Sequence, residues 1–175
     1  MQPDHPRLVI ILGPTGVGKS RTAVDLALKF RGEIINSDSI QVYRGFDIGT
    51  DKPSPEDRRA VAHHLIDCVD PGVQFTAADF VREALAAAAD VVRRRRVPFV
   101  VGGTGLYLKA FIDGLFPGPG RDPALRAALE AEARAKGLEA LFRELEEVDP
   151  AYARKIRDRD RIRIIRALEV YRLTR

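Results

Sequence analysis

The stretch GPTGVGKS, from Gly13 to Ser20, indicates the fold class. It directly follows the apolar run 8–12 and directly precedes a helical pattern. This stretch is a complete phosphate loop, in which glycines let backbone N–H groups surround phosphate oxygens at a helix N-terminus. Lys19 adds a point charge, and the Ser20 hydroxyl is a candidate Mg²⁺ ligand. The loop predicts nucleotide or other polyphosphate binding, with ATP, GTP and further polyphosphates all open. The candidate phosphate-binding residues are Gly13, Pro14, Thr15, Gly16, Val17, Gly18, Lys19 and Ser20.

Apolar segments alternate with helical patterns on the C-terminal side of this loop. The predicted strands cover 7–12, 33–37, 64–69 and 97–101, and helices are predicted after Gly18, after Thr76 and over 106–112. Such alternation is typical of parallel β-α-β units. The sequence therefore predicts an α/β fold with a P-loop NTPase-like parallel sheet flanked by helices.

In sheets of this kind, ligands bind beyond the carboxyl ends of the strands. The phosphate loop, Asp38 and Gly102-Gly103-Thr104 all follow predicted strands, so we expect them to converge at one edge. Asp38 there can organise Mg²⁺, accept a proton from a nucleophile or cap a turn. Thr104 can donate to a phosphate or cap the next helix. Asp38, Thr104 and Lys19 are the candidate catalytic residues.

The hydrolytic motifs that usually accompany a phosphate loop are missing. The sequence contains no guanine-reading Asn-Lys-x-Asp, and the strand over 97–101 ends in two glycines where an acidic residue would hold Mg²⁺. The two adjacent histidines, His63 and His64, point to opposite faces of a strand, so they cannot bind one metal ion together. The loop is thus predicted to bind phosphate without recognisable hydrolytic residues.

A cluster of helix breakers, Phe116-Pro117-Gly118-Pro119-Gly120, separates this part from a charged helical remainder. Asp122 followed by Pro123 is typical of a helix start. We expect a P-loop core over 1–116, a helical insertion over 117–158 and a helix over 159–175 that returns to the core.

Composition and charge indicate where the protein acts and which kinds of partner it could bind. The net charge of +4 permits an anionic partner, and the run 93–96 of four arginines closes a helical pattern, where it complements the helix dipole. No apolar run reaches the roughly 20 residues that span a bilayer. The single cysteine, Cys68, fits a reducing compartment. We expect a cytoplasmic location and no membrane partner.

Six segments resemble one family closely, the tRNA dimethylallyltransferases, also called tRNA isopentenyltransferases. The pairing of the second segment with the fifth is highly specific, whereas the phosphate loop alone would not be. The segments are GPTGVGKS (13–20), INSDSIQVYRGFDIGTDKP (35–53), HHLIDCVDP (63–71), FTAADF (75–80), VGGTGLYLKAFIDGL (101–115) and RIIRALEVYRLT (163–174).

The resemblance implies transfer of a dimethylallyl group from dimethylallyl diphosphate to N6 of the adenosine at position 37 of a tRNA. It implies that the phosphate loop holds the donor diphosphate with Mg²⁺, that Asp38 is the general base, and that the helical insertion grips the anticodon stem-loop. A monomer is expected. The implied tRNA contacts are Asp38, Ser39, Ile40, Gln41, Thr104, Arg126, Ile162, Arg163, Ile164, Ile165 and Arg166.

Two departures from the family and two alternative functions accompany this resemblance. The family's chains continue well beyond the last segment, so we expect phosphate binding but low or no transferase activity from residues 1–175 alone. Ile162 stands where related chains often carry a polar or basic residue. The alternatives are a small-molecule P-loop kinase and an inactive RNA-binding fragment. Glutamates accompany the arginines of 117–150, which disfavours a kinase lid.

Overall fold

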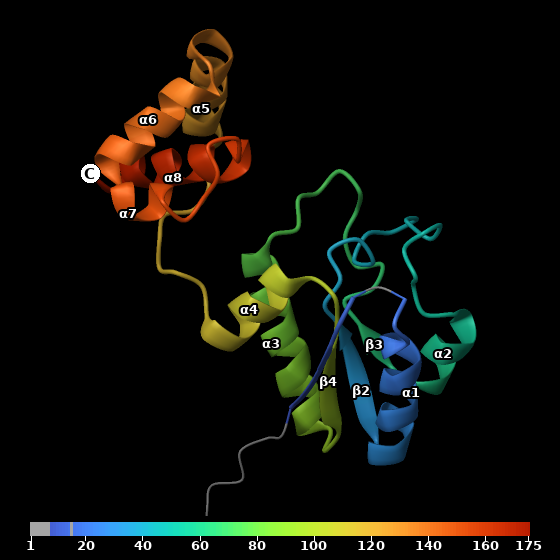
Figure 1. The fold of residues 1–175 in the computed structure, drawn as a ribbon. Coiled ribbons are helices and arrows are strands. Elements are labelled where there is room, and N and C mark those ends of the chain that lie inside the picture. Colours follow the sequence, from blue (N-terminus) through green and yellow to red (C-terminus); the bar gives the residue numbers. More distant parts are fainter. Residues whose placement is uncertain (1–7, 15) are drawn as a thin grey trace, which may run out of the picture. The chain divides into compact units, whose positions relative to one another are not determined.

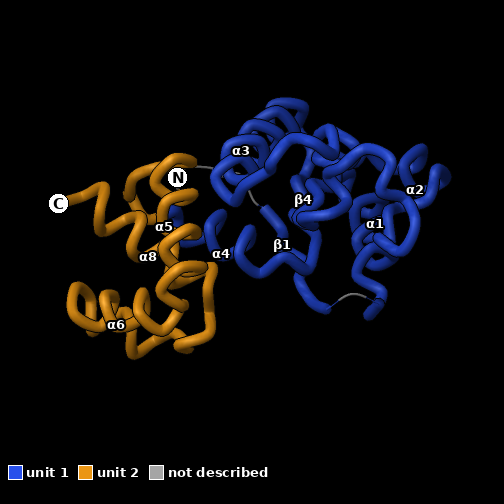
Figure 2. Tube along the Cα trace, turned by 90° about the horizontal axis from the view of Figure 1, so that it is seen from above, with its two compact units in different colours: residues 1–115 blue, residues 116–175 orange. Residues whose placement is uncertain are grey.

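The computed structural model describes residues 8–14 and 16–175, which belong to two compact units, 1–115 and 116–175 (Figure 1, Figure 2). Unit 1 contains a parallel sheet in the order β1-β4-β2-β3. The predicted parallel α/β fold is therefore confirmed. The strands are β1 (Val9–Leu12), β2 (Gly32–Asn36), β3 (His63–His64) and β4 (Val97–Gly102).

Alternate residues of the central strands pack against helices on opposite faces of the sheet (Figure 1). Ile34 and Phe99 share a core with α1 (Lys19–Phe30), whereas Ile35 and Val100 share a core with α3 (Ala77–Arg93) and α4 (Gly105–Asp113). The short helix α2 (Pro55–Ala60) completes the helices of unit 1. Because successive strand side chains point to opposite faces, a continuous apolar strand serves two cores at once.

The start of α3 matches its prediction closely. The Thr76 hydroxyl accepts a hydrogen bond from the Asp79 backbone N–H, and the Asp79 carboxylate accepts one from the Thr76 N–H. This reciprocal capping box satisfies two backbone donors that would otherwise lack partners.

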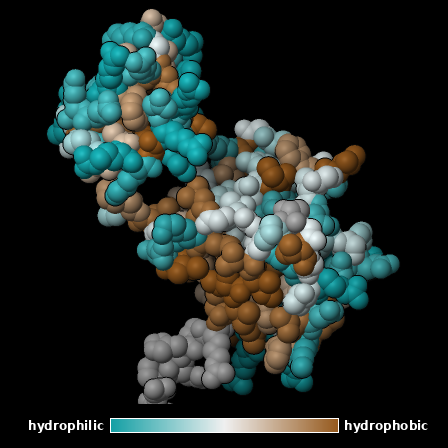
Figure 3. Space-filling view, in the orientation of Figure 1, coloured by the Kyte–Doolittle hydropathy of each residue, from teal (hydrophilic) through white to brown (hydrophobic). Residues whose placement is uncertain are grey.

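The strand β1 lies at an edge of the sheet that the structure describes. It pairs with β4, and its first three residues are half-buried while Leu12 is 67% exposed. Figure 3 shows hydrophobic residues gathered on the face of unit 1 over β1, α3 and α4. The continuous apolar sequence of β1 is typical of a strand buried on both faces, whereas β1 is only half-buried here.

The predicted strand over 64–69 is mostly wrong. Only His63 and His64 join the sheet, and Leu65 (φ 59°) and Asp67 (φ 53°) then adopt left-handed backbone that interrupts an extended chain. The chain becomes extended again at Val69, which forms an isolated parallel bridge with Tyr43. The apolar run therefore serves mainly to anchor the loop that follows β2.

Unit 2 is a helical unit with its own core, formed by Leu129, Leu141, Leu145, Ile164 and Leu168 among others. The expected helix cap is confirmed, since Asp122 accepts a hydrogen bond from the Leu125 N–H with Pro123 next to it. The helices are α5 (Pro123–Lys136), α6 (Leu138–Val148), α7 (Pro150–Ala153) and α8 (Arg161–Thr174).

The last helix, α8, belongs to unit 2. The apolar face of α8 contributes to the core of unit 2, where it packs against α5 and α6. Its Glu169 is fully buried and accepts hydrogen bonds from the Asp122 N–H, Arg126 and Arg166. Burial raises the pKa of Glu169, but these hydrogen bonds outweigh it and hold the pKa below its usual value. Within the described part of the chain, no helix is both long and apolar enough for a membrane span.

Candidate active site

The phosphate loop connects β1 to α1, and one of its predicted residues, Thr15, lies outside the described residues. Gly16 (φ 84°) and Gly18 (φ 86°) adopt left-handed backbone, which favours glycine. Gly18 precedes α1 without a capping side chain, so the first N–H groups of α1 are available to an anion. The Lys19 ammonium donates to the Pro14 carbonyl at 2.6 Å, which places this cation over the loop.

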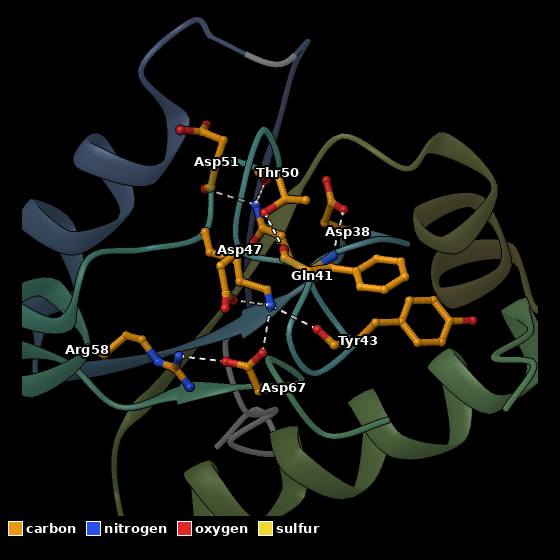
Figure 4. A network of polar contacts seen from close by, with 10 residues as sticks. Asp38, Gln41, Tyr43, Asp47, Thr50, Asp51, Arg58 and Asp67 are labelled. Atoms are coloured by element: carbon orange, nitrogen blue, oxygen red, sulfur yellow. Dashed lines mark hydrogen bonds and ion pairs between the residues drawn. The ribbon is translucent and has the colours of Figure 1, made fainter. Parts of the chain in front are cut away.

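Asp38 follows β2 in a tight turn of the chain. Its Oδ1 accepts hydrogen bonds from the backbone N–H groups of Ile40 (2.8 Å) and Gln41 (3.2 Å). Figure 4 shows the Asp38 and Gln41 side chains on this turn. Asp38 thus caps this turn, and the same contacts set the direction of its carboxylate, which leaves it compatible with the two other expected roles, Mg²⁺ organisation and proton acceptance.

Thr104 and Gly102 join the segment after β4 to the segment after β2. The Thr104 hydroxyl accepts a hydrogen bond from the Ser39 N–H at 3.0 Å, and the Thr104 N–H donates to the Ser37 carbonyl at 3.3 Å. A Cβ at Gly102 would lie 2.4 Å from the Ser37 carbonyl oxygen, so only glycine permits this approach. The Thr104 side chain does not cap α4; it holds the Asp38 loop.

One pocket brings these segments together, which confirms their expected convergence at the carboxyl edge of the sheet. Lys19 and Ser20 of α1 line it together with Asp38, Gln41 and the pair Gly102-Gly103. The remaining wall includes apolar side chains from the sheet, α1 and the following loops. These apolar residues are Ala23, Ile34, Pro53, Ile66 and Val101.

Three polar residues of this pocket were not predicted: Asn36, Asp51 and His63. Asn36 donates its side-chain N–H to the Leu65 carbonyl at 3.0 Å. The His63 Nδ1 lies 2.8 Å from the Val61 carbonyl oxygen, and burial lowers the pKa of this imidazole. Asn36 could have been predicted, because it is the last residue of a strand and lies at the carboxyl edge of the sheet. The positions of Asp51 and His63 depend on how the loop between β2 and β3 folds, which the sequence pattern does not show.

His63 and His64 were predicted to point to opposite faces of a strand, and they contact different residues. His64 Nε2 lies 2.7 Å from Oε2 of the buried Glu33, a partner different from that of His63. Among the residues that the structure describes, no group of three or more His, Cys, Asp and Glu residues could hold a metal ion.

The predicted tRNA-contacting residues fall on both units and differ in accessibility. In unit 1, Asp38, Ser39, Ile40 and Gln41 share one loop, which Thr104 holds, and Ile40 is 45% exposed. In unit 2, Arg126 and Arg166 form ion pairs with the buried Glu169. Arg166 also donates to the Pro119 carbonyl at 2.7 Å. These two arginines therefore support the fold of unit 2, whatever else they bind.

The predicted tRNA contacts Ile164 and Ile165 differ from their neighbours in burial. They are 0% and 2% exposed in the core of unit 2, so their side chains pack within this unit. Their neighbours remain accessible, with Ile162 78% exposed and the Arg163 side chain 62% exposed. Because an α-helix turns by 3.6 residues, a continuous stretch of it cannot present every side chain to one ligand.

The fold is that of a P-loop NTPase-like protein of the parallel α/β class, and its candidate site lies at the carboxyl edge of the sheet. A family model described as IPP transferase matches residues 41–175. The chain belongs to the IPP transferase family.

Relatives support this assignment over almost the whole chain. The chain is 54% identical over 171 residues to tRNA dimethylallyltransferase 2 of Geotalea uraniireducens, which covers 98% of this chain and 55% of that protein. It resembles the solved tRNA isopentenylpyrophosphate transferase of Bacillus halodurans (46% identity, TM-score 0.64, 97% of this chain and 56% of that one). A solved eukaryotic dimethylallyltransferase acting on tRNA matches with 33% identity and a TM-score of 0.80, over 95% of this chain and 42% of that one. The chain thus spans about half the length of the curated relatives it matches.

Proposed function

We propose that this protein transfers a dimethylallyl group from dimethylallyl diphosphate to N6 of adenosine 37 in tRNA, giving N6-isopentenyladenosine. The observation that carries the proposal is the pocket that Lys19 and Ser20, the last two residues of the phosphate loop, line together with Asp38. The names of the relatives, tRNA dimethylallyltransferase and tRNA isopentenylpyrophosphate transferase, support the same reaction.

Dimethylallyl diphosphate has a charged diphosphate end and an apolar hydrocarbon end, and the pocket offers suitable residues for both. Lys19 and the first N–H groups of α1 would neutralise the diphosphate, which makes it a better leaving group. Apolar lining residues such as Ala23, Ile34 and Val101 suit the short hydrocarbon group. A nucleotide would need contacts for a base and a ribose, and the sequence contains no guanine-reading motif.

Mg²⁺ fits the same pocket by the chemistry of its oxygen donors. Ser20, Asp38 and Asp51 line it, and their side chains carry a hydroxyl and two carboxylates. Mg²⁺ usually takes one or two protein ligands and completes its shell with water and phosphate oxygens, so it needs no larger cluster. Ser20 would hold the ion, which supplies positive charge to the departing diphosphate when bound.

The transfer step requires one proton acceptor on the protein. The N6 amine forms a bond to C1 of the dimethylallyl group as the bond from C1 to the diphosphate oxygen breaks. Asp38 accepts the proton that N6 loses, and the diphosphate leaves with the electron pair. Thr104 supports this step by holding the loop of Asp38 through the Ser39 N–H. The target base must leave its stack to reach the pocket, as enzymes that modify single bases require.

Thermal protection tests which ligand the loop prefers. We expect dimethylallyl diphosphate with Mg²⁺ at 100 times its dissociation constant to raise the unfolding midpoint by about 5–10 °C, from about 2.7 kcal/mol of linkage. ATP at the same concentration should give a smaller shift, and inorganic pyrophosphate separates the phosphate contribution from the hydrocarbon one. Greater protection by ATP would favour the small-molecule kinase and contradict the proposed donor.

The salt dependence of tRNA binding tests the role of α8. We expect the tRNA association constant to fall linearly with salt on logarithmic axes, because phosphate contacts release counterions. The substitution Arg163→Gln should weaken binding and reduce the slope by about one. Arg143→Gln is the matched control, since Arg143 is also exposed on a helix of unit 2 but lies outside the predicted contacts. Equal slopes for the wild-type protein and both variants would remove Arg163 from the interface.

The cellular setting follows from substrate and composition. A tRNA substrate and a single cysteine, Cys68, both support a reducing cytoplasm as the location. We expect the protein to act as a monomer, which sedimentation of the full-length protein would establish.

A further inference from the structure

The segment between β2 and α2 carries Asp38 near its start and a buried lysine, Lys52, near its end. Lys52 Nζ donates to the Tyr43 carbonyl at 2.8 Å, to Asp47 at 2.8 Å and to Asp67 at 2.6 Å (Figure 4). The Lys52 side chain is only 7% exposed. An ammonium group has three N–H donors, so these contacts use its full capacity.

The three partners of Lys52 come from two parts of the chain. Tyr43 and Asp47 belong to the same loop as Lys52, whereas Asp67 belongs to the segment after β3. Asp67 also accepts a hydrogen bond from Arg58 at 2.7 Å. Burial lowers the pKa of Lys52, but the hydrogen bonds to Asp47 and Asp67 outweigh it and raise the pKa above its usual value. Lys52 is therefore a stable cation that joins two loops.

Gln41 connects this buried cation to Asp38. Its side-chain amide donates to the carbonyls of Thr50 (2.9 Å) and Asp51 (3.0 Å), the two residues directly before Lys52. The Gln41 carbonyl accepts a hydrogen bond from the Asp67 N–H at 3.2 Å, and the Gln41 N–H donates to the Asp38 carboxylate. A displacement of Lys52 would thus reach Asp38 through one residue.

We propose that Lys52 is a positioning residue, which holds the loop of residues 38–52 so that the Asp38 carboxylate keeps its direction in the donor pocket. Lys52 does not line this pocket, so it acts through Gln41 and Asp38 and not on the substrates. This inference rests on the proposed function, in which Asp38 is the proton acceptor. Small displacements of a catalytic group reduce rates strongly, since the proton must pass over hydrogen-bond distance.

The test is the variant Lys52→Met in the full-length protein, which removes the ammonium group and keeps an unbranched side chain that is one heavy atom shorter. We expect the single-turnover transfer rate at saturating donor and tRNA to fall by about 10- to 100-fold. The affinity for dimethylallyl diphosphate should change less than about twofold, because the phosphate loop lies outside the Lys52 contacts. The matched control is Lys109→Met, which removes an exposed lysine of α4 that pairs with Asp113, and it should leave the rate unchanged.

A double-mutant cycle separates positioning from a general loss of structure. In an Asp38→Asn background, Lys52→Met should lower the remaining rate by less than about threefold, because the group that it positions no longer accepts a proton. A purely structural role predicts the same loss in both backgrounds and would overturn the inference, as would a full rate for Lys52→Met. If Asp38→Asn itself retains the full rate, the proposed proton acceptor fails as well, and the two failures are thereby distinguished.

A milder variant keeps the test decisive if Lys52→Met does not fold. Asp67→Asn preserves the size of a partner that is half-buried and weakens one ion pair of Lys52. We expect a loss of rate in the same direction, with unchanged donor affinity, that again disappears in the Asp38→Asn background. An unchanged rate, or an equal loss in both backgrounds, would count against the positioning role.

Discussion

Replacing Asp38 by asparagine lowers the rate of dimethylallyl transfer by about 10²–10⁴-fold, the usual contribution of a positioned general base. The substitution Asp38→Asn keeps a side-chain oxygen that can accept from the Ile40 and Gln41 N–H groups, so the turn is preserved. An amide cannot take the proton of the adenine amine at neutral pH. The measurement is single-turnover transfer by the full-length protein at saturating tRNA and donor.

Donor binding gives the control for this experiment. The dissociation constant for dimethylallyl diphosphate should change little in Asp38→Asn, because the diphosphate contacts belong to the phosphate loop. Asp25→Asn is a matched variant, since Asp25 is an exposed aspartate of α1 that pairs with Arg21. A full transfer rate in Asp38→Asn would reject the base role, and an equal loss in Asp25→Asn would point to a nonspecific charge effect.

Replacing Lys19 by alanine weakens the binding of dimethylallyl diphosphate by about 10- to 100-fold, as the loss of one hydrogen bond to a charged group predicts. Lys19 lies over the phosphate loop, with its ammonium 2.6 Å from the Pro14 carbonyl. The transfer rate should fall too, because the same cation stabilises the charge of the leaving diphosphate. Calorimetric titration with the diphosphate and single-turnover kinetics measure the two effects separately.

Lys29→Ala provides the comparison on the same helix. Lys29 lies in the last turn of α1, where its ammonium is 5.7 Å from the centre of the Phe30 ring. Its removal should leave donor affinity and transfer unchanged. If Lys19→Ala binds the donor as tightly as the wild-type protein, the loop is not the site of the diphosphate.

Local sequence patterns predicted much of the fold, because they act over a few residues. The phosphate-loop pattern requires a glycine at Gly18, which has left-handed backbone, as Gly16 also does. Thr76 and Asp122 were predicted as helix caps, and both accept the expected backbone hydrogen bonds. The breaker cluster at 116–120 predicted a boundary after residue 116, and the structure has two compact units, 1–115 and 116–175. Each of these features depends on backbone dihedral angles and capping within one turn.

Local sequence patterns could not predict the contacts between residues that are distant in the sequence. The sequence left open whether Thr104 caps a helix, and its hydroxyl instead contacts Ser39, 65 positions earlier. The buried contacts of Lys52 were equally invisible, since a lysine in a polar loop gives no local sign of burial. Arg126 was predicted to contact tRNA, and its pairing with Glu169 depends on how α5 packs against α8.

The sequence by itself determined the phosphate loop, the alternation of strands and helices, and the edge of the sheet at which the candidate residues meet. These follow from residue periodicity and from the constraint that parallel strands present their carboxyl ends together. Only the tertiary structure decided which side chains line the pocket, that Ile164 and Ile165 are buried, and that Lys52 supports the loop of Asp38. The physical reason is that burial and ion pairing depend on segments brought together by packing, which no short stretch of sequence specifies.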